Sequence, residues 1–115
     1  MATRKLEKSE WKDYFDRVSK QLGAKLVEIE TASLDIGDQV EAEWIAFQGI
    51  DYDPKDDLVE VVLDNLDHMI RHPQEVYVDE DPAEGLKSVE VVDGEGRKHI
   101  LKLRSPLALP EPEGA

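Results

Sequence analysis

Apolar residues near the start of the chain recur at the spacing of one face of an α-helix. They stand at i, i+3, i+4, i+7 and i+11, and they are Trp11, Tyr14, Phe15, Val18 and Leu22. Such positions align along a single stripe of a helix surface. Ser9 suits the N-cap of this helix, and Gly23 suits its end. The pattern therefore predicts an amphipathic helix over residues 9–22 that packs its stripe on a sheet.

Most of the remaining chain consists of short apolar or alternating stretches that are typical of strands. We predict strands over residues 25–31, 40–50, 58–63, 75–78, 86–92 and 98–103, with turns at 32–38 and 93–96. The apolar face changes within residues 40–50, so this strand is either covered on both sides or shifted by a bulge at Gly49. Leu66, Met69 and Ile70 share a helical face before Pro73, which predicts a short second helix.

This order of elements, joined by short connections, predicts an α+β fold. The N-terminal helix would pack on a mainly antiparallel sheet of five to six strands, with the hairpin 44–63 in the middle. The alternative is a helix followed by a bent SH3-like or Sm-like barrel. In either case residues 1–104 form one domain, and the Pro-rich residues 105–115 are expected to be a disordered tail. The strand 75–78 is expected to leave a bare sheet edge, which would support a weak homodimer if the protein is not a monomer.

The chain has a formal net charge of −13, and this charge is concentrated in its middle. Residues 28–84 hold 18 acidic residues, against only Lys55 and Arg71 as basic ones. A surface of this sign repels nucleic acid and anionic membranes and favours a basic protein partner. The chain has no long apolar run and no apolar segment of a signal peptide near its start, so we expect a cytoplasmic protein.

The most acidic turn offers a candidate binding site. It comprises Asp51, Tyr52, Asp53, Lys55, Asp56 and Asp57. Read as a calcium loop from Asp51, the positions that should hold Asp, Gly and Glu hold Lys55, Asp56 and Val62 instead. We therefore interpret the segment as a type I turn with Asp53 first and Pro54 second, closed by the Asp53 side chain. Its exposed carboxylates make it a recognition surface to test.

Two histidines offer a candidate metal site. His68 and His72 are four residues apart, so on the predicted second helix they would share a face and could bind a transition metal. A firm site needs a third ligand, for which Asp64, Asp67 and Glu75 are the neighbours in sequence. Arg71 between the histidines would oppose the metal charge.

The sequence favours a non-catalytic role over an enzyme, and no cofactor is indicated. Without cysteine there are no disulfides, thiolate nucleophiles or cysteine-ligated metal sites. No serine stands in a Gly-x-Ser-x-Gly elbow, and no glycine-rich phosphate loop precedes a helix.

Several segments resemble a family of small acidic bacterial proteins catalogued as a domain of unknown function. They are residues 49–57, His68, Pro73, residues 85–93 and residues 103–107. The resemblance covers nearly the whole chain. It implies a stand-alone, single-domain bacterial protein, and it implies no activity, cofactor or catalytic residue.

These observations leave three hypotheses. The first is a binding or adaptor module that acts through an acidic surface or a sheet edge. The second is a metal-dependent enzyme or metal sensor that uses His68 and His72. The third is a nucleic-acid mimic that binds a basic protein.

Overall fold

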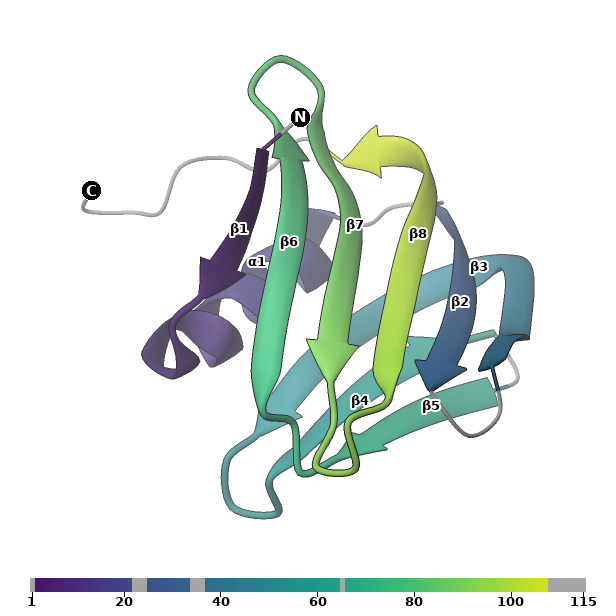
Figure 1. Cartoon of the computed structure of the whole chain (residues 1–115). Coiled ribbons are helices and arrows are strands. Elements are labelled where there is room, and N and C mark those ends of the chain that lie inside the picture. The colour runs from purple at the N-terminus through teal and green to yellow at the C-terminus, as the bar shows by residue number, and fades with distance from the viewer. Residues whose placement is uncertain (1, 22–24, 34–36, 65, 108–115) are drawn as a thin grey trace.

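The computed structural model describes residues 2–21, 25–33, 37–64 and 66–107. Eight antiparallel strands form one sheet with the order β1-β6-β7-β8-β2-β3-β4-β5, accompanied by one α-helix (Figure 1). The elements are β1 (Ala2–Leu6), a 3-10 turn (Lys8–Glu10), α1 (Trp11–Gln21), β2 (Leu26–Ser33), β3 (Gly37–Asp53), β4 (Leu58–Leu63), β5 (Leu66–Arg71), β6 (Glu75–Asp81), β7 (Gly85–Val92) and β8 (Lys98–Leu107).

The predicted fold class is wrong, both as an α+β fold with two helices and as a small bent barrel. The protein is mainly β, with a larger sheet than predicted, because two segments form unforeseen strands. β1 pairs with β6 from Ala2↔Glu80 to Leu6↔Val76, although its sequence is mostly polar. The predicted second helix is strand β5, which pairs with β4 over its whole length. Within the described residues β1 and β5 are the two ends of the sheet, so the predicted edge strand 75–78 lies in its interior, as part of β6.

The long strand β3 changes its pairing partner and thereby bends the sheet. Its first part pairs with β2 as far as Ala46, and its second part pairs with β4 from Phe47 onward. An irregularity lies on each side of this change. Trp44 has a left-handed φ of 48°, and the register with β4 shifts between Phe47 and Gly49, which confirms a bulge near Gly49. As a result β3, β4 and β5 cross behind the strands of the larger part (Figure 1).

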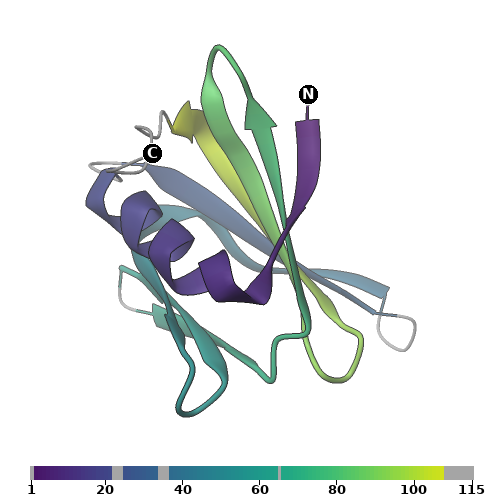
Figure 2. The ribbon, with the colours of Figure 1, turned by 90° about the vertical axis from the view of Figure 1, so that its left-hand side faces the viewer.

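The helix packs between the two parts of the bent sheet (Figure 2). Four of the five predicted stripe residues are buried, namely Trp11, Tyr14, Phe15 and Val18, and the fifth, Leu22, lies outside the described residues. Trp11 contacts Tyr52 of β3 edge-on, with ring centroids 5.1 Å apart. The Tyr14 hydroxyl donates a hydrogen bond to Glu80 of β6 at 2.7 Å. One apolar stripe therefore joins both parts of the sheet to a common core.

Ser19 of α1 satisfies the backbone of β3 where this strand has left β2. Its Oγ accepts a hydrogen bond from the Ile50 N–H at 2.9 Å and donates one to the Ile50 carbonyl at 2.8 Å. Leaving partly buried backbone groups without a hydrogen bond costs free energy. The Ser19 hydroxyl supplies the hydrogen bonds that a neighbouring strand would otherwise make. Ser9, the predicted N-cap, is exposed. The turn before the helix is instead closed by Glu7, whose N–H donates to Glu10 Oε1 at 2.8 Å.

The predicted end of the domain at residue 104 falls inside β8, which continues through Leu107. Leu107 is buried and lies opposite Leu86 of β7. The remainder of the predicted tail, residues 108–115, lies outside the described residues.

We predict that Ser19→Ala lowers the free energy of unfolding by about 1–3 kcal/mol, because it leaves both backbone groups of Ile50 without a partner. Chemical denaturation measures the loss, and hydrogen exchange should show a less protected Ile50 amide. Ser9→Ala is the matched control and should change stability little, because the Ser9 side chain is exposed. Equal losses in the two variants would contradict this role of Ser19.

Candidate functional site

The acidic turn between β3 and β4 is closed as the sequence predicts. Asp53 Oδ1 accepts hydrogen bonds from the backbone N–H of Lys55 at 2.9 Å and from that of Asp56 at 3.4 Å. Asp57 then takes a left-handed φ of 51°, and β4 begins at Leu58. The side chain of Asp53 is therefore occupied in shaping the turn, whereas Lys55 and Asp56 are exposed.

The other predicted binding residues of this turn have structural partners. Tyr52 is buried, and its hydroxyl donates to Asp57 Oδ1 at 3.0 Å. Burial and the hydrogen bond to Asp57 raise the pKa of Tyr52 above its ordinary value. The Asp51 carboxylate lies 3.3 Å from the Lys12 ammonium of α1. The structure thus brings the predicted residues together, but Tyr52 serves as packing, and the exposed side chains are those of Asp51, Lys55 and Asp56.

The structure separates the two histidines of the predicted metal pair. His68 lies in a strand and not on a helix, and its Nε2 is 2.9 Å from His99 Nδ1 of β8. His72 follows β5 with a φ of 53°, and its Nδ1 lies 3.4 Å from Asp57 Oδ2. Residues four apart in a strand are separated by about 13 Å, so the geometric reason for a shared metal is lost. No group of three or more metal-ligating side chains occurs within the described ranges.

A second cluster, which sequence reasoning missed, lies where β5 meets the β7–β8 hairpin. Asp93 Oδ2 accepts a hydrogen bond from His99 Nε2 at 2.9 Å, and His99 in turn contacts His68. The pair is well buried, with side-chain exposures of 8% for His99 and 12% for Asp93. This chain of side chains ties strand β5 to the opposite part of the sheet. Its only sequence signal is an aspartate at the start of a hairpin loop and a histidine shortly after it.

Asp93 also organises the hairpin itself. Its Oδ1 accepts from the backbone N–H of Glu95 at 2.9 Å and from that of Arg97 at 3.0 Å. Burial raises the pKa of Asp93, but the hydrogen bonds from His99 and from these two amides outweigh it and hold the pKa below its ordinary value. The carboxylate is therefore structural: each of its oxygens already has a donor.

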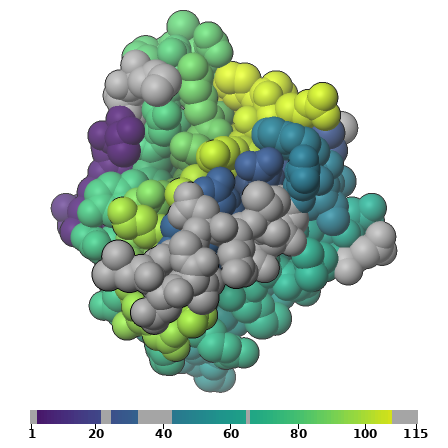
Figure 3. Space-filling view, turned by 45° about the vertical axis from the view of Figure 1, so that its right-hand side comes forward, coloured from purple at the N-terminus to yellow at the C-terminus, as the bar shows by residue number. Residues whose placement is uncertain are grey.

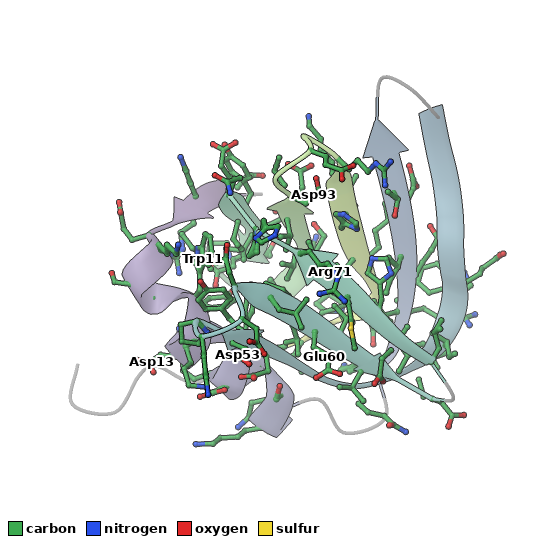
Figure 4. The ribbon with its side chains drawn as sticks, turned by 90° about the horizontal axis from the view of Figure 1, so that it is seen from below. Trp11, Asp13, Asp53, Glu60, Arg71 and Asp93 are labelled. Carbon is green, nitrogen blue, oxygen red and sulfur yellow. The ribbon has the colours of Figure 1, made fainter. Side chains whose placement is uncertain are left out.

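A cleft of about 750 Å³ lies beside this cluster, between the end of β5 and the hairpin. Its lining includes Met69 and Arg71 from β5 and Arg97 and His99 from the hairpin and β8. Seen from below, Arg71 lies between Glu60 of β4 and Asp93 of the hairpin (Figure 4). Arg97 is 3.5 Å from Glu95, whereas the Arg71 guanidinium has no ion pair among the described residues. Arg71 is thus a cation available to a partner.

The outer face of β3, β4 and β5 carries four carboxylates, those of Asp51, Asp53, Glu60 and Asp67. The inward residues of β4 are buried, so alternation fixes its outward ones, and the register fixes those of β3 and β5. We call this the acidic face, and it comprises Asp51, Asp53, Leu58, Glu60, Val62, Asp67, Met69 and Arg71. In register, Glu60 stands between Asp51 and Met69, with Asp67 diagonally adjacent.

Like charges on the acidic face disturb one another. Partial burial and the negative charges of Asp67 and Asp51 raise the pKa of Glu60 above its ordinary value. Like charges directly opposite on neighbouring strands are destabilising. Lys12 offsets part of the charge through Asp51. The carboxylates of the acidic face therefore repel one another in the folded protein, and a bound cation would reduce this repulsion.

Comparison with known proteins places the chain in a family. It matches a family of unknown function (DUF5335) over residues 2–112, and it belongs to that family. An uncharacterized protein from the bacterium Aquifex aeolicus is 44% identical over 112 residues, which cover 96% of this chain and 100% of that protein. The predicted resemblance to a family without assigned activity is thereby confirmed. No solved structure matches the chain. Within the described residues no helix has the length and apolar character needed to cross a membrane.

We predict that Asp93→Asn lowers the free energy of unfolding at neutral pH by about 2 kcal/mol, because it removes hydrogen bonds to a charged group. The pKa of Asp93 is lowered by folding, so its contribution is present above the ordinary aspartate pKa of about 3.9 and is lost as the pH falls through the lower folded value. Stability measured against pH should therefore show the wild type converging on the variant in acid. Asp56→Asn, in the exposed turn, is the control, and a constant difference at all pH values would argue against this role.

We predict that Glu60→Gln raises stability at neutral pH by a few tenths to about 1 kcal/mol, because it removes a carboxylate from between like charges. The folded pKa of Glu60 is raised, so this residue favours folding only where it is protonated, and that benefit is lost as the pH rises through the folded pKa. The gain should appear in thermal unfolding, shrink with added salt and vanish below about pH 4. A loss of stability at neutral pH would contradict the arrangement described.

Proposed function

We propose that this protein is a non-catalytic binding module that docks a basic segment of a partner protein on its acidic face. The observation that carries the proposal is the cluster of Asp51, Glu60 and Asp67 on one sheet face, of which Asp51 alone has an ion pair among the described residues. A folded protein gains stability by dispersing like charges, and arrangements that cost stability are typical of surfaces kept for function. A bound lysine or arginine would offset the repulsion that raises the pKa of Glu60.

Apolar groups within the acidic face support a protein ligand over a free cation. Leu58 and Val62 are half-buried beside Glu60 on β4, and Met69 is 45% exposed on β5. On β4 the Glu60 carboxylate stands between the apolar Leu58 and Val62, so the face suits an extended segment that presents basic and apolar residues in turn on one side. Metal ions would gain nothing from these apolar neighbours. Electrostatic attraction would speed encounter with such a segment and set its orientation.

Binding of a labelled peptide that repeats Lys-Lys-Val-Val tests this function, because an extended chain of this sequence presents both residue types in turn on each side. Fluorescence anisotropy should show an affinity that falls with rising salt, because the contacts are exposed. Glu60→Gln combined with Asp67→Asn should weaken binding several-fold to about tenfold, given two lost charge contacts.

The matched control is Glu84→Gln combined with Glu90→Gln, which removes the same charge from the β6–β7 turn and from the outward face of β7, in the larger part of the sheet. This variant should bind the peptide nearly as well as the wild type. Equal weakening in both double variants would show that net charge alone attracts the peptide. Salt-independent binding would contradict an electrostatic docking surface.

A further inference from the structure

The free edge of β5 offers its backbone in a defined register. The His72 N–H donates to the Asp57 carbonyl at 2.9 Å, next to the β4–β5 pairing. Backbone groups in an antiparallel pair point alternately toward and away from the partner strand, so the even-numbered residues of β5 face β4. The N–H and C=O groups of Asp67, Met69 and Arg71 therefore point away from β4, along the outer edge of the sheet.

The side chains of these three residues form a sequence that is complementary to itself. All three are exposed on the acidic face, in the order acidic, apolar, basic. An antiparallel copy of the same strand, centred on Met69, places Asp67 opposite Arg71 at one end and Arg71 opposite Asp67 at the other. In this register the residues that face each other are also the ones whose backbone N–H and C=O groups point outward. Opposite charges and backbone hydrogen bonds therefore favour the same alignment.

We propose that a second copy of this chain pairs with β5 edge to edge, forming an antiparallel two-fold dimer centred on Met69. Three residue pairs exchange backbone hydrogen bonds, and they are Asp67 with Arg71, Met69 with Met69 and Arg71 with Asp67 of the second copy. The strands β3, β4 and β5 of both copies then form one continuous sheet. The interface is isologous, as closed two-fold symmetry requires. It does not depend on the function proposed above.

Exposed apolar and charged groups on β5 favour this occupant. The described residues leave three large hydrophobic side chains exposed, and two of them, Leu66 and Met69, belong to β5. Arg71 has no ion pair among the described residues, and Asp67 raises the pKa of its like-charged neighbour Glu60. Pairing with a second copy gives Arg71 an anion, gives Asp67 a cation and covers Met69. One self-complementary contact would thus pair both charged side chains and bury the exposed methionine.

The other end strand does not offer the same contact. β1 presents Arg4 and Lys5 together, so two antiparallel copies of β1 centred on this pair would oppose cations in the middle of the strand. Both cations already have partners, because Arg4 is 2.8 Å from Glu80 and Lys5 is 3.1 Å from Glu75. Charges on an end strand generally guard it against pairing. On β1 they do so, whereas on β5 they specify one register.

The edge of β5 borders the cleft of about 750 Å³, in which Met69 and Arg71 form one wall and residues of the β7–β8 hairpin form the other. In the space-filling view the teal surface of the β4–β5 segment lies below that of β8, on the outside of the molecule (Figure 3). A strand added to β5 would continue this part of the sheet outward.

Sedimentation velocity over a range of protein concentrations tests the dimer, with variants in which the charges of Asp67 and Arg71 are reversed. The wild type should show a reversible monomer–dimer equilibrium. Arg71→Asp alone or Asp67→Arg alone opposes like charges at both ends of the interface and should weaken dimerisation about tenfold or more. The combined Asp67→Arg and Arg71→Asp variant keeps the wild-type composition and restores opposite charges, so it should dimerise as the wild type does.

Two further measurements separate this interface from others. Met69→Pro removes an outward N–H from an end strand, a position where proline is tolerated, and should leave a folded monomer. In the wild type, hydrogen exchange of the Asp67, Met69 and Arg71 amides should slow as concentration rises. A wild type that stays monomeric at its highest soluble concentration would overturn the proposal. So would a dimer that resists both single charge reversals, or a combined variant that fails to recover.

Discussion

The fold depends on one strand taking part in two sets of pairings. β3 pairs with β2 as far as Ala46 and joins β4 from Phe47, and the positive φ of Trp44 and the bulge near Gly49 let the backbone turn without ending the strand. Everything behind the larger part of the sheet follows from this change of direction. It exposes one side of β3 to α1, and it carries β5 across to the β7–β8 hairpin. Two side-chain connections then fix the bend: Ser19 with the backbone of Ile50, and His68 with His99.

The two connections contrast with the surface that they support. Inside the bend, polar groups are closely matched, as in the three hydrogen bonds to Asp93. Outside it, Glu60 stands among like charges, and the cation nearest in register, Arg71, is unpaired among the described residues. A chain that satisfies the polar groups of Ser19, Asp93 and His99 but leaves its outer charges in conflict has a rigid support beneath an electrostatically unfavourable surface. That combination suits binding, because a partner supplies what the monomer lacks and little ordering is required.

Sequence reasoning succeeded where a pattern was local and strong. The stripe of Trp11, Tyr14, Phe15 and Val18 predicted α1, and the turn closed by Asp53 was foreseen. It failed where tertiary pairing overrode a local pattern. Leu66, Met69 and Ile70 have helical spacing, yet only Ile70 is buried, because β5 is an end strand that needs few apolar residues. The polar β1 gave no signal, because its pairing with β6 supplies the order that its composition does not. The contact of His68 with His99 joins residues far apart in sequence, and no spacing rule could find it.

The pairing of β1 with β6 also bears on how the protein is made. Ala2 lies opposite Glu80, so the first strand of the chain cannot find its neighbour until most of the chain has been synthesised. At 5–20 residues per second this separation corresponds to a wait of about 4–16 s. Throughout that time the amphipathic helix would have no complete core to cover, because β6, β7 and β8 all emerge later. The apolar stripe of α1 is therefore exposed in the nascent chain until the sheet closes around it.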